Sequence, residues 1–216
     1  DGAPRDGHYV LTADIDMSGV KGFKPIASKK DKGFIGTFDG QFHAIKGLRV
    51  EYEKKYAGLF GYVGSGGAIK NVKIADSSIT VSATGAQAYA YVGGLCGYNA
   101  GGAITDCYNT VNITANTVKP AYHTYTGGVC GYNDSGAITN CYNTGDLNAT
   151  AYYHAYAGGV CGKNAGGTIA DCMNSGSICA TATTDQNSFA YTGGICGYSE
   201  TGSGTATITN CYNAGS

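Results

Sequence analysis

Aromatic and small residues alternate with a period of two in four short segments of the chain. The segments are 88–92, 122–126, 153–157 and 188–192. A period of two is typical of a β-strand with two different faces, whereas an amphipathic helix repeats its apolar positions about every 3.6 residues. No helical period accompanies these segments, so the pattern predicts short strands joined by turns.

Each of these strands begins one copy of a longer repeat. A Gly-Gly-hydrophobic-Cys-Gly block follows the strand, and a second block ending in Cys-Tyr-Asn or Cys-Met-Asn follows that. The first cysteines of the four copies, Cys96, Cys130, Cys161 and Cys196, are 34, 31 and 35 residues apart. A more divergent fifth copy, at 58–62 and 68–72, precedes them.

A period near 33 residues without helical spacing predicts a β-solenoid. Helical repeats of similar length need the 3.6-residue apolar period, which this chain lacks. Each repeat would form one coil of short strands, stacked in parallel about 4.8 Å from the next coil. We predict an N-terminal cap or incomplete first coil at 1–50 and one continuous solenoid of about five coils at 51–216.

Composition and charge narrow the classes of function. Only 13% of the 216 residues are charged, the formal net charge is -1, and glycine occurs 36 times. A nucleic-acid-binding protein would show a basic excess, and a membrane helix needs about 20 consecutive apolar residues. Neither feature is present, so we expect no nucleic-acid partner and no membrane insertion. Twelve of the 14 basic residues lie within 1–73, which we interpret as a solvated end of the molecule.

The repeat also carries a family resemblance. Its residues are Gly-Gly-Leu-Cys-Gly-Tyr-Asn at 93–99 and Ala-Ile-Thr-Asp-Cys-Tyr-Asn at 103–109. This unit resembles the GLUG repeat of bacterial surface proteins, and 9–17 with 36–48 resembles the segment that often precedes such repeats. GLUG-type segments occur in adhesin-like proteins and beside the catalytic parts of IgA-cleaving zinc peptidases. The resemblance implies a right-handed parallel β-helix on an extracellular bacterial surface and no catalytic residues in this segment.

Eight of the nine cysteines form two columns when the repeats are aligned. The columns are Cys96, Cys130, Cys161, Cys196 and Cys107, Cys141, Cys172, Cys211. Buried thiols, disulfides and a metal or iron–sulfur array are three possible interpretations. The divergent copy has Phe60 and Val72 at these positions, which favours two buried apolar columns. Cys179 stands outside both columns and is expected to be a free thiol facing solvent or a loop.

Two columns of asparagine accompany the cysteines. They are Asn109, Asn143, Asn174, Asn213 and Asn99, Asn133, Asn164. Asparagine tolerates left-handed turns, and stacked side-chain amides can bond to each other along a solenoid. We therefore expect turn residues whose amides form ladders, rather than ligand-binding groups.

Two aromatic-rich columns are the candidate binding site. They are Tyr89, His123, His154, Phe189 and Tyr91, Tyr125, Tyr156, Tyr191. Members of the two columns are two residues apart, so they share one face of a sheet, and the small residues between them suit the interior. An exposed aromatic face would bind sugar rings or protein, whereas covered rings would stabilise the sheet by stacking. A metal site at His123 and His154 is not favoured, because Tyr89 and Phe189 share their column.

These observations predict a noncatalytic extracellular adhesin or ligand-binding module of a bacterial surface protein. Its partner would be a host glycan or extracellular protein, with further domains in a longer native chain, and we expect no cofactor and no metal. A passive stalk that presents another domain is one alternative. A carbohydrate-active enzyme is another, but it needs clustered carboxylates, and Asp106 and Asp171 would lie about 10 Å apart, two coils from each other. The sequence contains no HExxH, GxSxG or P-loop motif.

Overall fold

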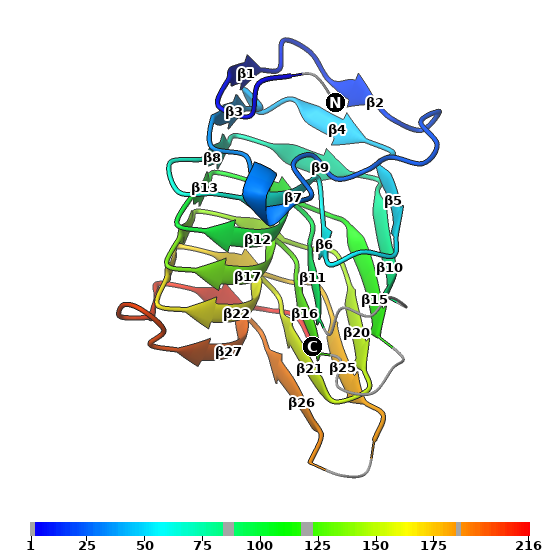
Figure 1. Cartoon of the computed structure of the whole chain (residues 1–216), viewed down its shortest axis with the longest axis vertical. Coiled ribbons are helices and arrows are strands. Elements are labelled where there is room, and N and C mark those ends of the chain that lie inside the picture. The colour runs from blue at the N-terminus through cyan, green and yellow to red at the C-terminus, as the bar shows by residue number, and fades with distance from the viewer. Residues whose placement is uncertain (1–2, 84–88, 118–122, 185–186) are drawn as a thin grey trace.

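Equivalent residues of successive repeats lie side by side on neighbouring strands. The computed structural model describes residues 3–83, 89–117, 123–184 and 187–216. Within these residues 29 strands form five sheets, and each complete coil contributes one strand to each sheet (Figure 1). The predicted all-β parallel β-solenoid with an N-terminal cap is confirmed.

Two sheets contain seven strands each in the described part of the chain. Sheet A consists of β1 (His8–Val10), β3 (Thr37–Asp39), β8 (Ala68–Lys70), β13 (Ala103–Thr105), β18 (Ala137–Thr139), β23 (Thr168–Ala170) and β28 (Thr207–Thr209). Sheet B consists of β2 (Ile15–Asp16), β4 (Ala44–Lys46), β9 (Lys73–Ala75), β14 (Tyr108–Asn109), β19 (Tyr142–Asn143), β24 (Met173–Asn174) and β29 (Tyr212–Asn213).

The other three sheets contain five described strands each. Sheet D consists of β5 (Arg49–Tyr52), β10 (Ser78–Ala83), β15 (Asn112–Thr117), β20 (Leu147–Ala151) and β25 (Ile178–Ala182). Sheet E consists of β6 (Tyr56–Ala57), β11 (Tyr89–Gly93), β16 (His123–Gly127), β21 (His154–Gly158) and β26 (Phe189–Gly193). Sheet C consists of β7 (Phe60–Val63), β12 (Cys96–Ala100), β17 (Cys130–Asp134), β22 (Cys161–Ala165) and β27 (Cys196–Glu200).

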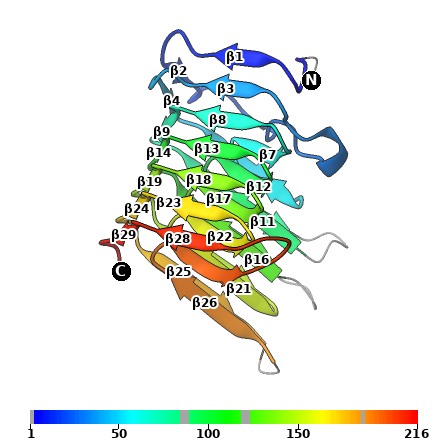
Figure 2. The same ribbon diagram turned by 90° about the vertical axis from the view of Figure 1, so that its left-hand side faces the viewer.

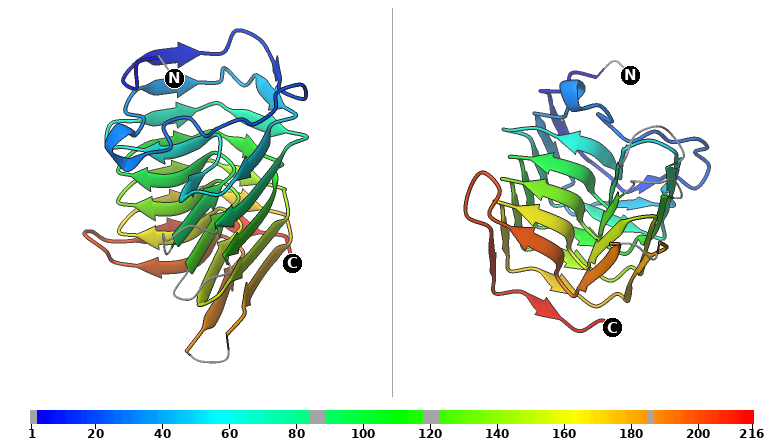
Figure 3. Two further views of the ribbon diagram at one scale, coloured as in Figure 1. Left: turned by 45° about the vertical axis from the view of Figure 1, so that its right-hand side comes forward. Right: turned by 60° about the horizontal axis from the view of Figure 1, so that its bottom comes forward.

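Each coil runs through sheets A, B, D, E and C before the next coil begins. Figure 2 shows the strands of sheets A and B in parallel layers, and Figure 3 shows the strands of sheets D and E inclined to those of sheets A and C. Every coil places one apolar residue at the same point of the core, as Ile104, Ile138 and Ile169 do on sheet A, all three fully buried. Each coil therefore buries its apolar side chains against its neighbours.

The N-terminal part closes the first end of the solenoid. Strands β1 to β4 extend sheets A and B, while Ile26 and Phe34 form parallel bridges to Phe60 and Val63 at the end of sheet C. The 3₁₀ turn η1 (Lys30–Lys32) lies between these two bridges. The Phe34 and Phe60 rings pack 4.9 Å apart, so the cap shares the main core. The boundary at residue 50 stays a prediction.

Both cysteine columns lie in this core. Cys96, Cys130 and Cys161 are fully buried and in register, and Phe60 takes the same place in the preceding coil. All nine cysteines lie in the described part of the chain, and all nine are free thiols. The predicted apolar columns are thus confirmed in place of disulfides. Cys179 is exposed, as expected.

The asparagine columns form amide ladders in the core. Asn143 Nδ2 donates to Gly145 O at 2.9 Å and to Asn174 Oδ1 at 2.8 Å, and Asn109 donates to Asn143 Oδ1 at 2.9 Å. The second ladder joins Asn99, Asn133 and Asn164 in the same way. The predicted ladders are confirmed, because an amide can donate and accept and so can bond to its own copy.

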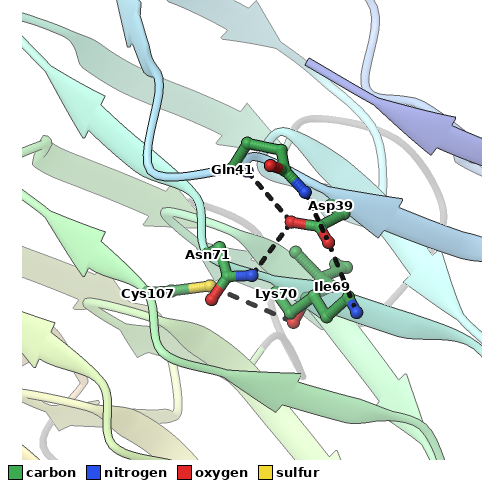
Figure 4. A network of polar contacts seen from close by, with 6 residues as sticks. All are labelled: Asp39, Gln41, Ile69, Lys70, Asn71 and Cys107. Carbon is green, nitrogen blue, oxygen red and sulfur yellow. Dashed lines mark hydrogen bonds and ion pairs between the residues drawn. The ribbon is translucent and has the colours of Figure 1, made fainter. Parts of the chain in front are cut away.

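The predicted left-handed turn role of these asparagines is wrong. The left-handed residues form a different column at the corner between sheets A and B, with φ between 51° and 55°: Asn71, Asp106, Asn140, Asp171 and Asn210. At the start of this column Asp39 accepts hydrogen bonds from Asn71 Nδ2 and Gln41 N, both at 2.9 Å, and pairs with Lys70 (Figure 4). The Asn71 and Gln41 bonds hold the pKa of Asp39 at about 2. Asn and Asp suit this corner because they tolerate left-handed backbone.

The thiol environments predict a sharp order of reactivity. Cys179 is expected to react with a disulfide reagent in the native protein at the rate of an exposed thiol. Burial raises the pKa of Cys130 and Cys161 well above its ordinary value, so these thiols should react only after unfolding. Timed labelling with mass spectrometry checks this order. The Cys179→Ser variant should lack the fast phase, and fast native labelling of Cys130 would contradict the burial.

The amide ladder predicts a large cost for interrupting it. Asn143→Ala removes bonds to three residues: the Asn109 amide loses one of its two acceptors, and Asn174 Oδ1 loses its donor from Asn143. We expect the free energy of unfolding to fall by about 3 kcal/mol, since each buried unsatisfied group costs about 1–3 kcal/mol. Denaturant unfolding measures this. Asn148→Ala on the exposed face of sheet D is the matched control and should change stability by less than about 0.5 kcal/mol.

Candidate functional site

Two adjacent glycines in each repeat create the site by bending the chain between sheets E and C. A Cβ atom on Gly93 would lie 2.2 Å from Cys96 O, and one on Gly127 would lie 2.0 Å from Cys130 O. No side chain fits in that space, so glycine is required. The bend brings the outer faces of sheets E and C together. We call the concave surface between them the aromatic corner.

Three columns of side chains line the aromatic corner. The proximal column of sheet E, next to the bend, contains Tyr56, Tyr91, Tyr125, Tyr156 and Tyr191. The distal column of sheet E contains Tyr89, His123, His154 and Phe189. The facing column of sheet C contains Tyr62, Tyr98, Tyr132, Lys163 and Tyr198. The structure thus brings all eight predicted site residues together on one outer face.

The proximal and facing columns pack against each other. Along the proximal column the rings of Tyr91, Tyr125 and Tyr156 stack 5.1 and 4.8 Å apart with nearly parallel planes. Across the corner Tyr91 meets Tyr98 edge-on at 5.2 Å, and Tyr125 meets Tyr132 at 5.3 Å. Both geometries are favourable for aromatic rings. The tyrosines therefore form a second core outside the solenoid interior.

Burial differs strongly between the proximal and distal columns. Tyr91 is 8% exposed and Tyr125 is 7% exposed, and burial raises the pKa of both hydroxyls. Burial also raises the pKa of Tyr156 to about 12. In the distal column the His123 and His154 rings stack 4.7 Å apart and remain partly exposed, and Phe189 is 51% exposed. The distal column therefore offers ring surface to a ligand, whereas the rings of Tyr91 and Tyr125 are covered. Tyr198, in the facing column, is 37% exposed as well.

Two lysines sit against the tyrosines. Lys55 Nζ lies 5.4 Å from the ring centres of Tyr56 and Tyr91, at the N-terminal end of the corner. Lys163 takes the place of a tyrosine in the facing column, with Nζ 5.4 Å from the Tyr132 ring. It also pairs with Glu200 at 2.9 Å. Cation–π contacts of this kind stabilise the ring stack without interrupting it.

Sequence reasoning overlooked the facing column. Its signal is the residue that follows the last glycine of the first block. This residue is tyrosine in Gly97-Tyr98 and Gly131-Tyr132, and lysine in Gly162-Lys163. The repeat shows that these tyrosines form a column, but it does not show that the column faces sheet E. That proximity depends on the angle of the Gly-Gly bend.

The histidines of the distal column have lowered basicity. Burial and the neighbouring His154 lower the pKa of His123 to about 4, and burial also lowers the pKa of His154. The Phe189 backbone N–H donates to His154 Nδ1 at 3.1 Å. Both rings are therefore neutral near pH 7. Within the described residues, no three His, Cys, Asp or Glu side chains are placed to share a metal ion.

Comparison with known proteins identifies the repeat. Residues 88–114, 122–148 and 153–178 each match the GLUG motif, which confirms the resemblance found in the sequence. The chain is 40% identical over 87 residues to Halomucin of Haloquadratum walsbyi, covering 36% of this chain and 1% of that protein. It is 33% identical over 100 residues to a provisionally named Gly-rich membrane protein of Evansella cellulosilytica, covering 44% of this chain and 11% of that protein. The chain thus spans a small part of either curated relative.

A solved structure shares the fold. It is a Bacteroides ovatus protein provisionally described as an immunoglobulin A1 protease, with a TM-score of 0.57 and 21% sequence identity. The similarity covers 96% of this chain and 68% of that one, and it concerns the fold alone. In the described part of the present chain, no helix has the length and apolar character needed to cross a membrane.

The lowered pKa of His123 predicts a specific loss of stability in mild acid. The His123 side chain binds a proton near pH 6.5 in the unfolded chain but only near pH 4 in the folded chain. Its contribution to the free energy of unfolding is therefore complete above pH 6.5 and decreases as the pH falls from 6.5 to 4. Urea unfolding at pH 7.5, 6.0 and 5.0 measures the decrease. His123→Phe, which places another flat ring in the column, should flatten this pH dependence. An unchanged slope in that variant would contradict the assignment.

Proposed function

We propose that this chain, a GLUG-repeat β-solenoid, is a noncatalytic ligand-binding module of a longer extracellular surface protein of the adhesin type. Its ligand is an extracellular glycan or protein that binds to the distal column of the aromatic corner. The observation that carries the proposal is the continuous row of partly exposed rings at Tyr89, His123, His154 and Phe189, held in place by a buried layer of tyrosines.

Preorganisation supports binding at this row. The distal rings stack on one another at 4.7 to 5.4 Å, and Tyr89 also contacts Tyr125 of the proximal column at 6.3 Å. Rings that are already fixed lose little conformational entropy when a ligand binds. Because the stacked rings cover one another's faces, their outer edges form the surface, which suits sugar rings or aromatic and aliphatic protein side chains.

The description of one relative supports a place at the cell surface. One relative is described as a membrane protein, and this chain matches only 11% of its length. The solenoid is a rod of stacked coils, and such a rod can form one part of a much longer surface polypeptide. We propose the same setting here, outside a bacterial cell and beside further domains.

A passive stalk is the second candidate, and one observation favours it. The proximal and facing tyrosines contact each other, so most of the aromatic surface in the corner stiffens the rod and is not available to a ligand. A rod with such ladders on several sides would hold another domain at a fixed distance. The two candidates differ at the distal column: in the binding module these rings contact a ligand, and in the stalk they contact none.

Binding arrays with matched variants distinguish the two candidates. We expect the wild-type protein to bind a glycan or an extracellular-matrix protein, and His154→Ala/Phe189→Ala to lower that affinity at least tenfold. Both side chains are partly or largely exposed, so the variant should retain its circular dichroism spectrum and melting temperature within a few degrees.

Phe42→Ala is the control for this experiment. It removes an aromatic ring that is 72% exposed in the turn between β3 and β4, away from the corner, and should leave binding to the corner unchanged. No ligand on either array, or equal binding by the distal-column variant, would refute the binding module and leave the stalk.

A further inference from the structure

A second aromatic column lies on the outer face of sheet B. Tyr108, Tyr142, Met173 and Tyr212 are in register on strands β14, β19, β24 and β29. Each lies between a cysteine and an asparagine that point into the solenoid, so its own side chain points outward. Tyr108 is 37% exposed, Tyr142 36% and Tyr212 63%. Figure 2 shows these strands stacked along one side of the molecule.

The ring faces in this column are not covered by one another. In the aromatic corner every in-register pair of neighbouring tyrosines stacks at about 5 Å. Tyr108 and Tyr142 are paired in register as well, yet among the described residues no ring contact joins them. The Tyr142 hydroxyl instead donates to Asn140 Oδ1 at 3.0 Å, which directs the side chain toward the corner between sheets A and B. Ring surface therefore remains available to another molecule.

Polar columns border the tyrosines on both sides. On one side the left-handed corner residues alternate between acid and amide: Asp106, Asn140, Asp171 and Asn210. On the other side three of the four coils carry a hydroxyl, at Thr110, Thr144 and Ser175, and the fourth has Ala214. These three coils thus present one apolar side chain between a carboxylate or amide and a hydroxyl. We call this surface the sheet B strip.

We propose that the sheet B strip binds a linear, uncharged polysaccharide laid along the solenoid axis. A pyranose ring has an apolar face and a rim of hydroxyl groups, which matches an aromatic ring bordered by hydrogen-bonding groups. Strands repeat about every 4.8 Å, close to the length of one sugar unit in an extended chain, so successive sugars meet equivalent side chains. This site is separate from the aromatic corner and does not depend on the function proposed there.

Charge favours a neutral chain over an anionic one. Asp106 and Asp171 place carboxylates along the strip, and both are exposed. Lys73, with Nζ 5.8 Å from the Tyr108 ring, is the basic residue at its N-terminal end. Carboxylates repel an acidic polymer but accept hydrogen bonds from sugar hydroxyls. The apolar side chains of the strip form one row along the solenoid axis, and this arrangement also favours an unbranched ligand.

Calorimetric titration with defined oligosaccharides tests the proposal. The probes are cellohexaose, xylohexaose, mannohexaose and chitohexaose, each compared with its disaccharide. We expect at least one hexasaccharide to bind at least tenfold more tightly than its disaccharide, because a longer chain contacts more coils. Tyr108→Ala/Tyr142→Ala should weaken that binding at least tenfold, while Tyr142→Phe, which retains the ring, should weaken it less than threefold.

Phe42→Ala, which removes a ring that is 72% exposed outside both proposed surfaces, is the matched control and should bind the same hexasaccharide as the wild type does. Circular dichroism and thermal melting confirm that each variant is folded. The proposal is overturned if no hexasaccharide binds at millimolar concentration, if the double tyrosine variant binds equally well, or if the disaccharide binds as tightly. If the tyrosine variant instead loses only a protein from the matrix array, the strip is a protein-binding surface and the polysaccharide proposal fails.

Discussion

The in-register stacking of parallel strands is the constraint on which the rest of the structure depends. It places each residue one strand spacing, about 4.8 Å, from its counterparts in the coils above and below. A residue type can therefore recur in a column only if it tolerates its own copy as a neighbour. Amides satisfy this by donating to and accepting from each other, as Asn109, Asn143 and Asn174 do, and thiols satisfy it as small apolar groups. Carboxylates repel each other, so Asp106 and Asp171 alternate with amides in the exposed corner column.

Tyrosine shows how the same constraint produces two kinds of surface. In the aromatic corner the Gly-Gly bend folds the outer face of sheet E toward sheet C, and tyrosines from both sheets cover one another. In the described part of the chain no neighbouring sheet approaches the outer face of sheet B, and Tyr108 and Tyr142 remain exposed. The first arrangement stiffens the rod and supports the distal rings, whereas the second leaves ring faces open along the axis. The side chain is the same, and the difference comes from the angle between sheets.

Rigidity and repetition together suggest why such a scaffold suits binding to extended partners. Ladders of amides and rings fix the side chains of each coil relative to the next, and each coil repeats the same chemistry at the same spacing. Each unit of a repetitive ligand can then make the same contacts with its own coil, so the number of contacts increases with the length of the ligand. This reasoning connects the two proposed surfaces, although different side chains form each of them and separate variants can test them.

The sequence by itself determined the coil, its register and the interior columns. The repeat spacing predicted parallel stacking, Phe60 and Val72 in the divergent copy identified the cysteines as core residues, and the exposed thiol at Cys179 followed from its place outside the columns. Sequence reasoning erred where it assigned left-handed turns to the ladder asparagines, because it could not tell which of two neighbouring Asn columns lies at a corner. Only the tertiary structure decided that Tyr91 and Tyr125 are covered, that Lys163 contacts tyrosine rings of both sheet E and sheet C, and that the tyrosines of sheet B stay open. The physical reason is that a repeat specifies which residues are neighbours along a column, whereas the bends between sheets decide which columns meet across a corner.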